Sequence, residues 1–239
     1  MPSTPTERPA ELVLWHLTDS ALPTGGFAHS AGMETYIQRG DIEGPEDYEH
    51  WLRGYLRQAS YNEALAVRFA VELQLSGASF EERLARVMEL DRVLNATQTP
   101  RELRASMKSM GKRWSRIGAI VTPDDELVVA YRDALNARTA YGNPGLAAGL
   151  VLGASGVDVR TAVTAYLMQM ANSMTQNAIR AVPLGQDAGQ RVLVSVYGTV
   201  LEAAELTLGH CEEDLGAAAP ALEVAQMAHE ELRSRMFMS

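Results

Sequence analysis

The sequence predicts an all-α protein that folds as one bundle-like domain of about ten helices. Apolar residues recur every three or four positions through most of the 239 residues, which is the spacing of amphipathic helices. Clusters of Pro, Gly, Ser and Thr separate these periodic segments, and no segment alternates in the manner of a half-buried strand. Because 46% of the residues are hydrophobic, the chain can bury a substantial core.

A long buried helix is expected at the centre of the bundle, from Val192 to Leu208, preceded by a helix start at Asp187. Nearly every residue in this stretch is apolar or small. Its polar residues fall at spacings of four, three and three, and they are Ser195, Thr199, Glu202 and Glu205. A single narrow polar stripe is typical of a helix that is buried over most of its surface.

The helices before this central one are predicted from their apolar spacing and their end signals. Residues 1–7 carry two prolines and no apolar pattern, so we expect a frayed terminus there. Residues 19–26 concentrate Pro, Gly, Ser and Thr and are expected to form a loop. Helices are expected near residues 12–17, 27–39, 46–60, 62–75, after 79, after 99, after 123, and at 158–179.

Two of these helices carry the sequence pattern of a capping box. Ser79 is followed by Glu82, and Thr99 by Glu102, with Pro100 at the first helical position. Residues 141–156 are rich in Gly and Ala, and such small residues let helices approach closely. After Gly209 a linker is expected, followed by a last helix or tail.

Composition limits the classes of partner and compartment. The net charge of −9 disfavours nucleic acid and anionic membrane surfaces, which both reward clustered Lys and Arg. A single cysteine, Cys211, excludes an internal disulfide framework and fits a reducing cytoplasm. No secretory signal pattern and no apolar run of about 20 residues is present, so we expect a cytoplasmic protein.

No catalytic or metal-binding motif stands out. The phosphate-loop, H-E-x-x-H zinc and paired C-x-x-C patterns are missing. The adjacent pair His210 and Cys211 would point about 100° apart on a helix, which makes joint ligation awkward. His29 is expected on an inward face as a structural histidine. The basic segment from Arg101 to Arg116 is either a solvated helix face or a surface for an acidic partner.

Three separated stretches resemble the urease accessory protein F (UreF) family, in the order found in that family. Residues 22–37 read LPTGGFAHSAGMETYI, residues 182–193 read VPLGQDAGQRVL, and the C-terminus carries H-E followed by S-R-M-F. The middle region fits more loosely at Pro100–Arg104 and Gly111–Arg113. The residues that carry the resemblance are Pro23, Gly25, Gly32, Glu34, Pro183, Gly185, Gln186, Gly189 and Gln190.

The resemblance implies an all-α homodimer without enzymatic activity, which acts in nickel insertion into urease. Members of the family bind the D/H-type accessory protein and then recruit the G-type GTPase, and the assembly delivers Ni²⁺ to apo-urease. The chain is therefore expected to hold no stable cofactor of its own and to act in a pathway that depends on Ni²⁺ and GTP through its partners. Regulation of the GTPase and a nickel-conducting tunnel have both been proposed for the family.

The same resemblance implies which residues bind partners and divides the chain into a body, 1–225, and a C-terminal tail, 226–239, that becomes ordered on the D/H-type partner. The tail holds enough apolar side chains to need a covering surface. The implied partner-binding residues are Tyr36, Lys112, Arg113, His229, Glu230, Arg235, Met236 and Phe237.

Three further expectations concern particular positions. Gly185 and Gly189 are expected at close helix approaches, and Gln186 and Gln190 are expected to bridge backbone groups. Tyr141 departs from a histidine that is common in the family.

A rival hypothesis is an all-α enzyme or small-molecule binder, with a pocket beside the central helix that uses three side chains, His29, Glu34 and Tyr36.

Overall fold

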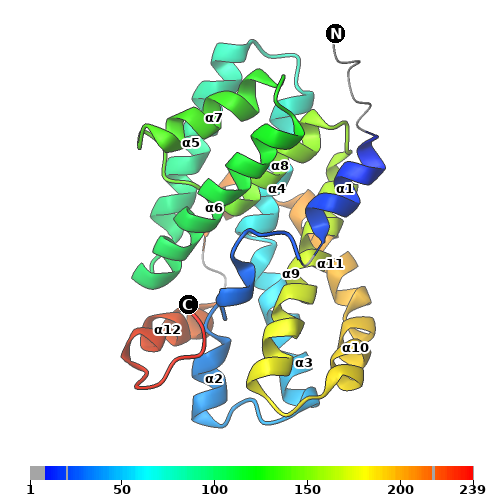
Figure 1. Cartoon of the computed structure of the whole chain (residues 1–239), viewed down its shortest axis with the longest axis vertical. Helices are drawn as coiled ribbons and strands as arrows, with labels where there is room; N and C mark the ends of the chain where they lie inside the picture. The colour runs from blue at the N-terminus through cyan, green and yellow to red at the C-terminus, as the bar shows by residue number, and fades with distance from the viewer. Residues whose placement is uncertain (1–8, 20, 217–218, 239) are drawn as a thin grey trace, which may run out of the picture.

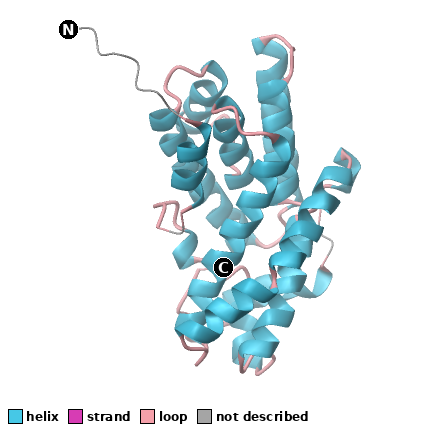
Figure 2. Ribbon diagram, turned by 90° about the vertical axis from the view of Figure 1, so that its right-hand side faces the viewer, coloured by secondary structure: helices cyan, strands magenta, loops and turns pink. Residues whose placement is uncertain are grey.

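A computed structural model describes residues 9–19, 21–216 and 219–238, and these residues are helical in the main (Figures 1 and 2). The expected frayed segment 1–7 lies outside the described residues. Extended pairing within the described ranges is limited to one isolated bridge between His29 and Met238. The predicted all-α class is therefore confirmed.

The helices follow one another with short connections. The α-helices are α1 (Ala10–Thr18), α2 (Met33–Arg39), α3 (Pro45–Ala59), α4 (Glu63–Leu75), α5 (Phe80–Thr97), α6 (Arg101–Val121), α7 (Glu126–Asn136), α8 (Pro144–Ala154), α9 (Val159–Ala181), α10 (Gln186–Ser195), α11 (Tyr197–Gly209) and α12 (Pro220–Ala228). The single-turn 3₁₀ helices are η1 (Gly26–Ala28), η2 (Glu212–Asp214) and η3 (His229–Glu231).

The centre of the core is α8, which is buried from Pro144 through Gly153 and packs most extensively on α4. A Cβ atom at Gly149 would lie 2.6 Å from the Cβ of Ala70 and 2.5 Å from the carbonyl oxygen of Val67. The two helices therefore touch through their backbones, as the small residues of this stretch predicted. The long helix α9 runs beside α4 and also contacts α3, α10 and α11 (Figure 1).

The expected single helix around Val192–Leu208 is wrong, because the chain bends by 44° at Val196 and forms α10 and α11. Burial is also one-sided: Leu201 is 59% exposed, whereas Thr199 of the expected polar stripe is 1% exposed. Thr199 is held inside because its hydroxyl accepts a hydrogen bond from Arg53 Nη1 at 2.5 Å. No described helix alone is long and apolar enough to cross a membrane, and α10 with α11 meets that requirement only as a bent pair.

The helix expected from Phe27 to Arg39 is also interrupted. Gly32 has a φ of +87°, so regular helix begins only at Met33. This left-handed glycine brings the backbone close to α12, since a Cβ at position 32 would lie 2.9 Å from Cγ of Gln226. The capping box at Ser79 is confirmed: its N–H donates to Glu82 Oε2 at 2.9 Å, and its hydroxyl accepts from the Glu82 N–H.

The expected division of the chain at residue 225 falls inside α12, and the division into a body and a tail stays a prediction. Ala225 and Gln226 are both buried, which ties α12 to the body. The described part of the tail, 226–238, folds back over α2 and the start of α6, and the C-terminus lies near η1 (Figure 1). Reordering of this segment on a partner stays a prediction.

Candidate partner-binding site

The first turn of α2 places the Glu34 carboxylate beneath the C-terminal tail. Its Oε1 accepts a hydrogen bond from the N–H of Met236 at 2.6 Å, and its Oε2 accepts one from the N–H of Phe237 at 3.1 Å. Oε2 also lies 3.0 Å from Nε2 of His229. Glu34 is only 6% exposed, so these three donors replace the water that a buried carboxylate loses.

His229 is completely buried between two carboxylates. Its Nε2 faces Glu34, and its Nδ1 lies 2.9 Å from Oε2 of Glu102 in the first turn of α6. Through its two ring nitrogens, His229 therefore bridges the carboxylates of α2 and α6. Glu102 Oε1 in turn accepts a hydrogen bond from Arg235 Nη1 at 2.7 Å. Four side chains, those of Glu34, His229, Glu102 and Arg235, thus join the tail to α2 and α6.

A second ion pair closes this arrangement at the start of α6. Arg101 Nη2 donates to Glu230 Oε2 at 2.6 Å, and the hydrogen bond from Arg101 lowers the pKa of the Glu230 carboxyl. Glu230 Oε1 also accepts from the N–H of Glu102 at 3.3 Å, at a helix N-terminus that favours negative charge. We call the whole set the tail-anchoring site; it consists of Glu34, Arg101, Glu102, His229, Glu230 and Arg235.

Backbone contacts fix the end of the tail against the loop before α2. The N–H of Met238 donates to the carbonyl of Ala28 at 2.6 Å, and the N–H of Ser30 donates to the carbonyl of Met238 at 2.9 Å. Phe237 is 6% exposed, with the Arg180 guanidinium 5.0 Å from the centre of its ring. The tail is therefore held by ionic, backbone and apolar contacts together.

The structure brings together most of the residues expected from the two terminal motifs. Tyr36 lies on α2 but outside this site, on a groove beside α3 and α12. The side chain of Met236 points outward and is 62% exposed. The motif residues that meet in or around the site are Gly32, Glu34, His229, Glu230, Arg235 and Phe237.

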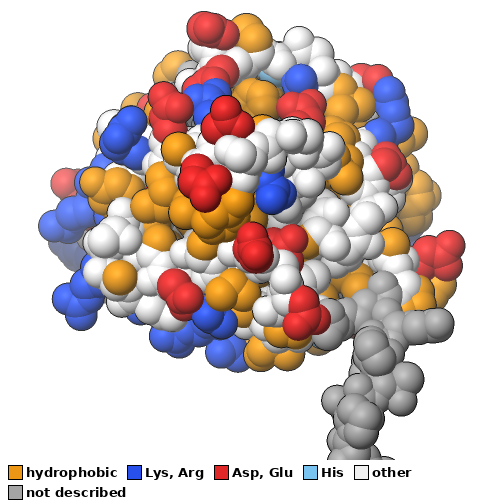
Figure 3. Space-filling view, turned by 90° about the horizontal axis from the view of Figure 1, so that it is seen from above, with side chains coloured by type: hydrophobic (Ala, Val, Ile, Leu, Met, Phe, Trp, Pro, Cys, Tyr) orange, Lys and Arg blue, Asp and Glu red, His pale blue; other side chains and the backbone are white. Residues whose placement is uncertain are grey.

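Lys112 and Arg113 do not belong to the tail-anchoring site. They lie further along α6, where Arg113 Nε donates to the carbonyl of Pro23 at 2.8 Å in the loop that also holds Gly25. Lys112 is half-buried and Arg116 is exposed on the same helix. Figure 3 shows Lys and Arg side chains gathered along the side of the molecule where α5, α6 and α7 lie in Figure 1.

The motif at residues 183–190 comprises the turn between α9 and α10, which holds Pro183 and Gly185, and the first residues of α10. Gly189 serves a close approach as expected, since a Cβ there would lie 2.6 Å from Ile179 Cδ1. The expectation for Gly185 is wrong, because a Cβ there would meet nothing within 4 Å, and its φ is +68°. Gln186 and Gln190 are exposed, and the described residues give neither side chain a hydrogen bond to the backbone.

Comparison with known proteins shows the family of this chain. The UreF family profile matches residues 42–197. The chain is 44% identical over 230 residues to the urease accessory protein UreF of Paenarthrobacter aurescens (strain TC1), covering 96% of this chain and 98% of that protein. It is also 35% identical over 229 residues to the UreF of Bacillus sp. (strain TB-90), covering 95% and 98%. The chain belongs to the UreF family of urease accessory proteins.

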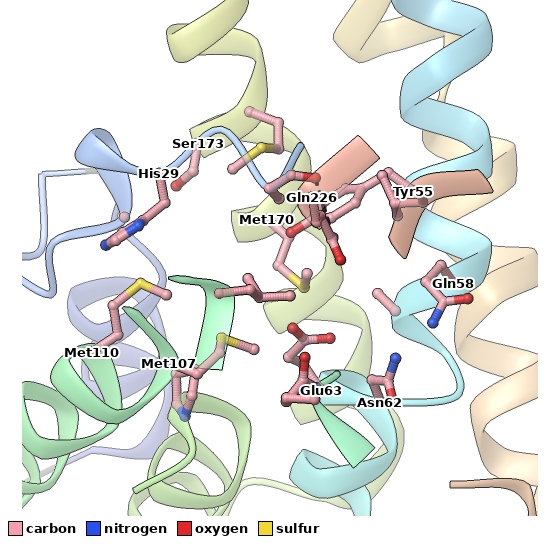
Figure 4. A pocket seen from close by; sticks show the side chains of 18 of the residues that line it. His29, Tyr55, Gln58, Asn62, Glu63, Met107, Met110, Met170, Ser173 and Gln226 are labelled. Carbon is pink, nitrogen blue, oxygen red and sulfur yellow. Dashed lines mark hydrogen bonds between the residues drawn. The ribbon is translucent and has the colours of Figure 1, made fainter. Parts of the chain in front are cut away.

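The UreF fold of this chain also forms a cavity of about 100 Å³, partly open to solvent, among α3, α4, α6, α9 and α12 (Figure 4). Met107 and Met110 line one side of it, and Gln58 and Asn62 line the opposite side. Glu63 is the buried carboxyl of this cavity, and burial raises its pKa from 4.5 to about 7. The cavity is therefore apolar with a polar edge.

The rival hypothesis of a single pocket is not supported by where its three residues lie. His29 lines the cavity of Figure 4, whereas Tyr36 lines the surface groove beside α3 and α12. The Glu34 carboxylate accepts hydrogen bonds from the backbone of the tail. The His210 ring lies 4.2 Å from the Tyr61 ring at a tilt of 33°, next to an exposed Cys211. Within the described ranges, no group of three or more His, Cys, Asp and Glu side chains is placed to hold a metal ion.

Sequence reasoning missed two acids and one base of this UreF-family chain. Glu102 was expected to cap Thr99, but its side chain bonds to His229 and Arg235 in the tail instead. Arg101 was read only as part of a basic row, although it pairs with Glu230. Asp91 is 1% exposed and accepts hydrogen bonds from Tyr131, at 2.6 Å, and from the N–H groups of residues 141 and 142. The loose motif at residues 100–104 was the only signal for the first two.

Tyr141, which stands where histidine is common in the family, has a structural place. Its N–H donates to Asp91 Oδ2 at 2.6 Å, and its ring lies 4.9 Å from Nζ of Lys108. The side chain is 46% exposed. The backbone at this position, rather than the ring, joins the buried Asp91 network.

Proposed function

We propose that this urease accessory protein acts in nickel insertion as a non-enzymatic scaffold in the cytoplasm. In this proposal a homodimer binds the D/H-type accessory protein, recruits the G-type GTPase, and brings both to apo-urease. Nickel and GTP are carried by these partners rather than held stably by this chain. Membership of the UreF family supports the role in urease maturation.

The observation that carries the proposal is the anchoring of the tail by side chains from three distant parts of the sequence. The anchored tail turns three methionine side chains outward: Met227 is 39% exposed, Met236 is 62% exposed and Met238 is 51% exposed. Flexible methionines suit a surface that adapts to a partner, and an exposed apolar patch marks an interaction site. The anchoring thus prepares a partner-binding surface at low entropic cost.

The basic side of α6 is proposed as a second contact surface. Lys112 and Arg116 lie on this helix, and Arg113 joins it to the loop at Pro23. In a chain of net charge −9, such a local reversal of sign favours one orientation of an acidic partner. We assign this surface to the recruited GTPase.

The test compares two arginines of the tail in capture experiments with the purified D/H-type protein and GTPase. Arg235→Ala removes the ion pair with Glu102, which positions the tail for the D/H-type protein, and we expect it to reduce capture of the GTPase recruited through that protein roughly tenfold. Arg233→Ala is the control, because Arg233 is exposed and lies two residues away. Equal GTPase capture by the two variants would contradict the proposal, as would failure of the unmodified chain to bind either protein.

A further inference from the structure

A surface groove of about 310 Å³ lies between α2, α3 and α12, and it shares Tyr55, Ala219 and Leu222 with the lining of the cavity in Figure 4. Its lining is largely apolar. Ile42 and Trp51 come from the body, and Ala221 and Leu222 come from the first turn of α12. The groove is therefore formed partly by the helix that leads into the anchored tail. This volume is at the lower end of the range for small-ligand pockets, enough for one or two side chains of a partner.

The side of the groove along α3 is aromatic. The rings of Trp51 and Tyr55 stack with centroids 5.1 Å apart and planes at 8°, and Tyr48 stacks on Trp51 at 6.3 Å. Trp51 and Tyr55 both line the groove. Because these rings stack on one another, they give the groove a flat apolar wall.

The charge around the groove is negative. Asp41 and Asp47 line it, and both are exposed. From Gly40 to Leu52 the sequence contains five carboxylates and neither Lys nor Arg. Asp47 also caps α3 by accepting hydrogen bonds from the backbone of residues 43 and 44.

The negative charge of Asp41 also acts on the phenol of Tyr36, which lines the other side of the groove. Burial raises the pKa of Tyr36, Arg39 opposes that shift, and the negative charge of Asp41 adds to it. Arg39 is therefore the basic group that acts on Tyr36 from α2, while Asp41 acts on it from the groove itself. An apolar floor between carboxylates complements a positively charged side chain with apolar neighbours.

We propose that this groove binds a short segment of a partner protein in which an arginine or lysine lies between apolar residues. The cation enters beside Asp41 and Asp47, and its apolar neighbours cover Ile42, Trp51 and Leu222. The same carboxylates repel phosphate, so nucleic acid does not fit. The inference goes beyond the scaffold function, because it does not depend on which protein carries the segment.

A library of random nonapeptides displayed on phage, selected on the full chain, tests this inference. We expect enrichment of peptides with Arg or Lys flanked by apolar residues. An enriched peptide is then synthesised with a fluorescent label, once with arginine or lysine and once with the neutral analogue citrulline or norleucine in its place. We expect the neutral peptide to bind roughly tenfold more weakly by fluorescence anisotropy. Enrichment without basic residues, or equal binding of the two peptides, would overturn the proposal.

Three variants locate the binding in the groove. Asp41→Lys reverses one charge, and Gly54→Met fills the groove, since a Cβ at Gly54 meets nothing within 4 Å and α3 should keep its fold. Glu11→Lys makes the same charge change on an exposed residue of α1. We expect the first two to weaken peptide binding roughly tenfold and the third to leave it unchanged. Equal loss in Asp41→Lys and Glu11→Lys would mean attraction to the acidic protein as a whole, and would overturn the assignment. Circular dichroism checks that each variant is folded.

Discussion

At the scale of single residues, Glu34 connects the tail to the body more directly than any other described side chain. It accepts hydrogen bonds from two backbone N–H groups of the tail and from the buried ring of His229. Glutamine has one acceptor oxygen, and its amide N–H₂ would face donors. We therefore expect Glu34→Gln to lower the free energy of unfolding by about 2–4 kcal/mol and to release the tail.

Urea denaturation measures the first effect, and hydrogen exchange at the backbone amides of Met236 and Phe237 measures the second. Glu231→Gln is the matched control, because Glu231 is exposed in the same segment. If Glu34→Gln leaves both amides as protected as they are in the control, the anchoring role of Glu34 is wrong.

Glu63 gives a pH-dependent prediction of a different kind. Burial raises its pKa from 4.5 to about 7. Between these two values the folded chain holds a proton that the unfolded chain has released, so the contribution of Glu63 to stability is fully present below pH 4.5 and is lost as pH rises to 7. Above pH 7 this contribution no longer changes. The loss amounts to at most about 3 kcal/mol.

Unfolding free energies at pH 5 and pH 8 measure this loss. We expect Glu63→Gln to remove most of the difference between the two pH values, because a neutral amide does not titrate. Glu126→Gln is the control, since Glu126 is exposed at the start of α7. An unchanged pH dependence in Glu63→Gln would show that another group titrates in this range.

The sequence predicts some residues of the tail-anchoring site but not the contacts between them. Glu34, His229 and Arg235 were selected through their motifs, yet no spacing rule says that a histidine near one terminus lies between two carboxylates near residues 34 and 102. Glu102 was misassigned because the local pattern Thr-x-x-Glu also describes a capping box. The tertiary contact with His229 outcompetes that local hydrogen bond.

At the scale of elements, the contact of α4 with α8 determines how tightly the core closes. The Gly149 Cβ position is occupied by the backbone of Val67 and the side chain of Ala70. We expect Gly149→Ala to destabilise the chain by about 1–3 kcal/mol, because even a methyl group overpacks this contact. Urea denaturation measures the change.

Gly198→Ala is the control for helix propensity. Gly198 lies in α11, where a Cβ would meet nothing within 4 Å. The same substitution there should stabilise the chain by up to about 1 kcal/mol. Stabilisation of both variants would mean that α4 and α8 separate easily, contrary to the close packing described above.

Local signals predicted some elements well and others poorly. Ser79 and Glu82 marked the start of α5 correctly because both partners of the box are adjacent in sequence. The prediction of one helix from Val192 to Leu208 failed because this stretch is apolar on nearly every side. The spacing of its apolar residues therefore does not identify which face of the helix is buried. The fold buries Val200 and Ala203 and leaves Leu201 exposed.

At the scale of the whole molecule, the fold brings the loop before α2, the start of α6 and the C-terminus to one place (Figure 1). The three lie more than sixty residues apart in sequence, so no local pattern reports their meeting. Family resemblance selected residues in each part, and the structure supplies the reason: side chains of α2, of the start of α6 and of the tail meet in the tail-anchoring site, and the loop before α2 adds backbone hydrogen bonds. The body and the tail are therefore one folded unit in this structure.

Two truncations separate folding from partner binding at this scale. Ending the chain after Leu232 removes Arg235 and the buried Phe237 but keeps α12 and His229. We expect unchanged helical circular dichroism and failure to capture the D/H-type protein. We also expect the free energy of unfolding to fall by about 2–3 kcal/mol, because the apolar surface that Phe237 covers becomes exposed.

Ending the chain after Ala225 also removes His229 and leaves Glu34 and Glu102 without the histidine between them, so the loss of stability should be clearly larger. Urea denaturation compares the two, and equal stability would mean that His229 adds nothing to the fold. Capture of the D/H-type protein by the longer truncated chain would mean that the tail end is not its binding surface.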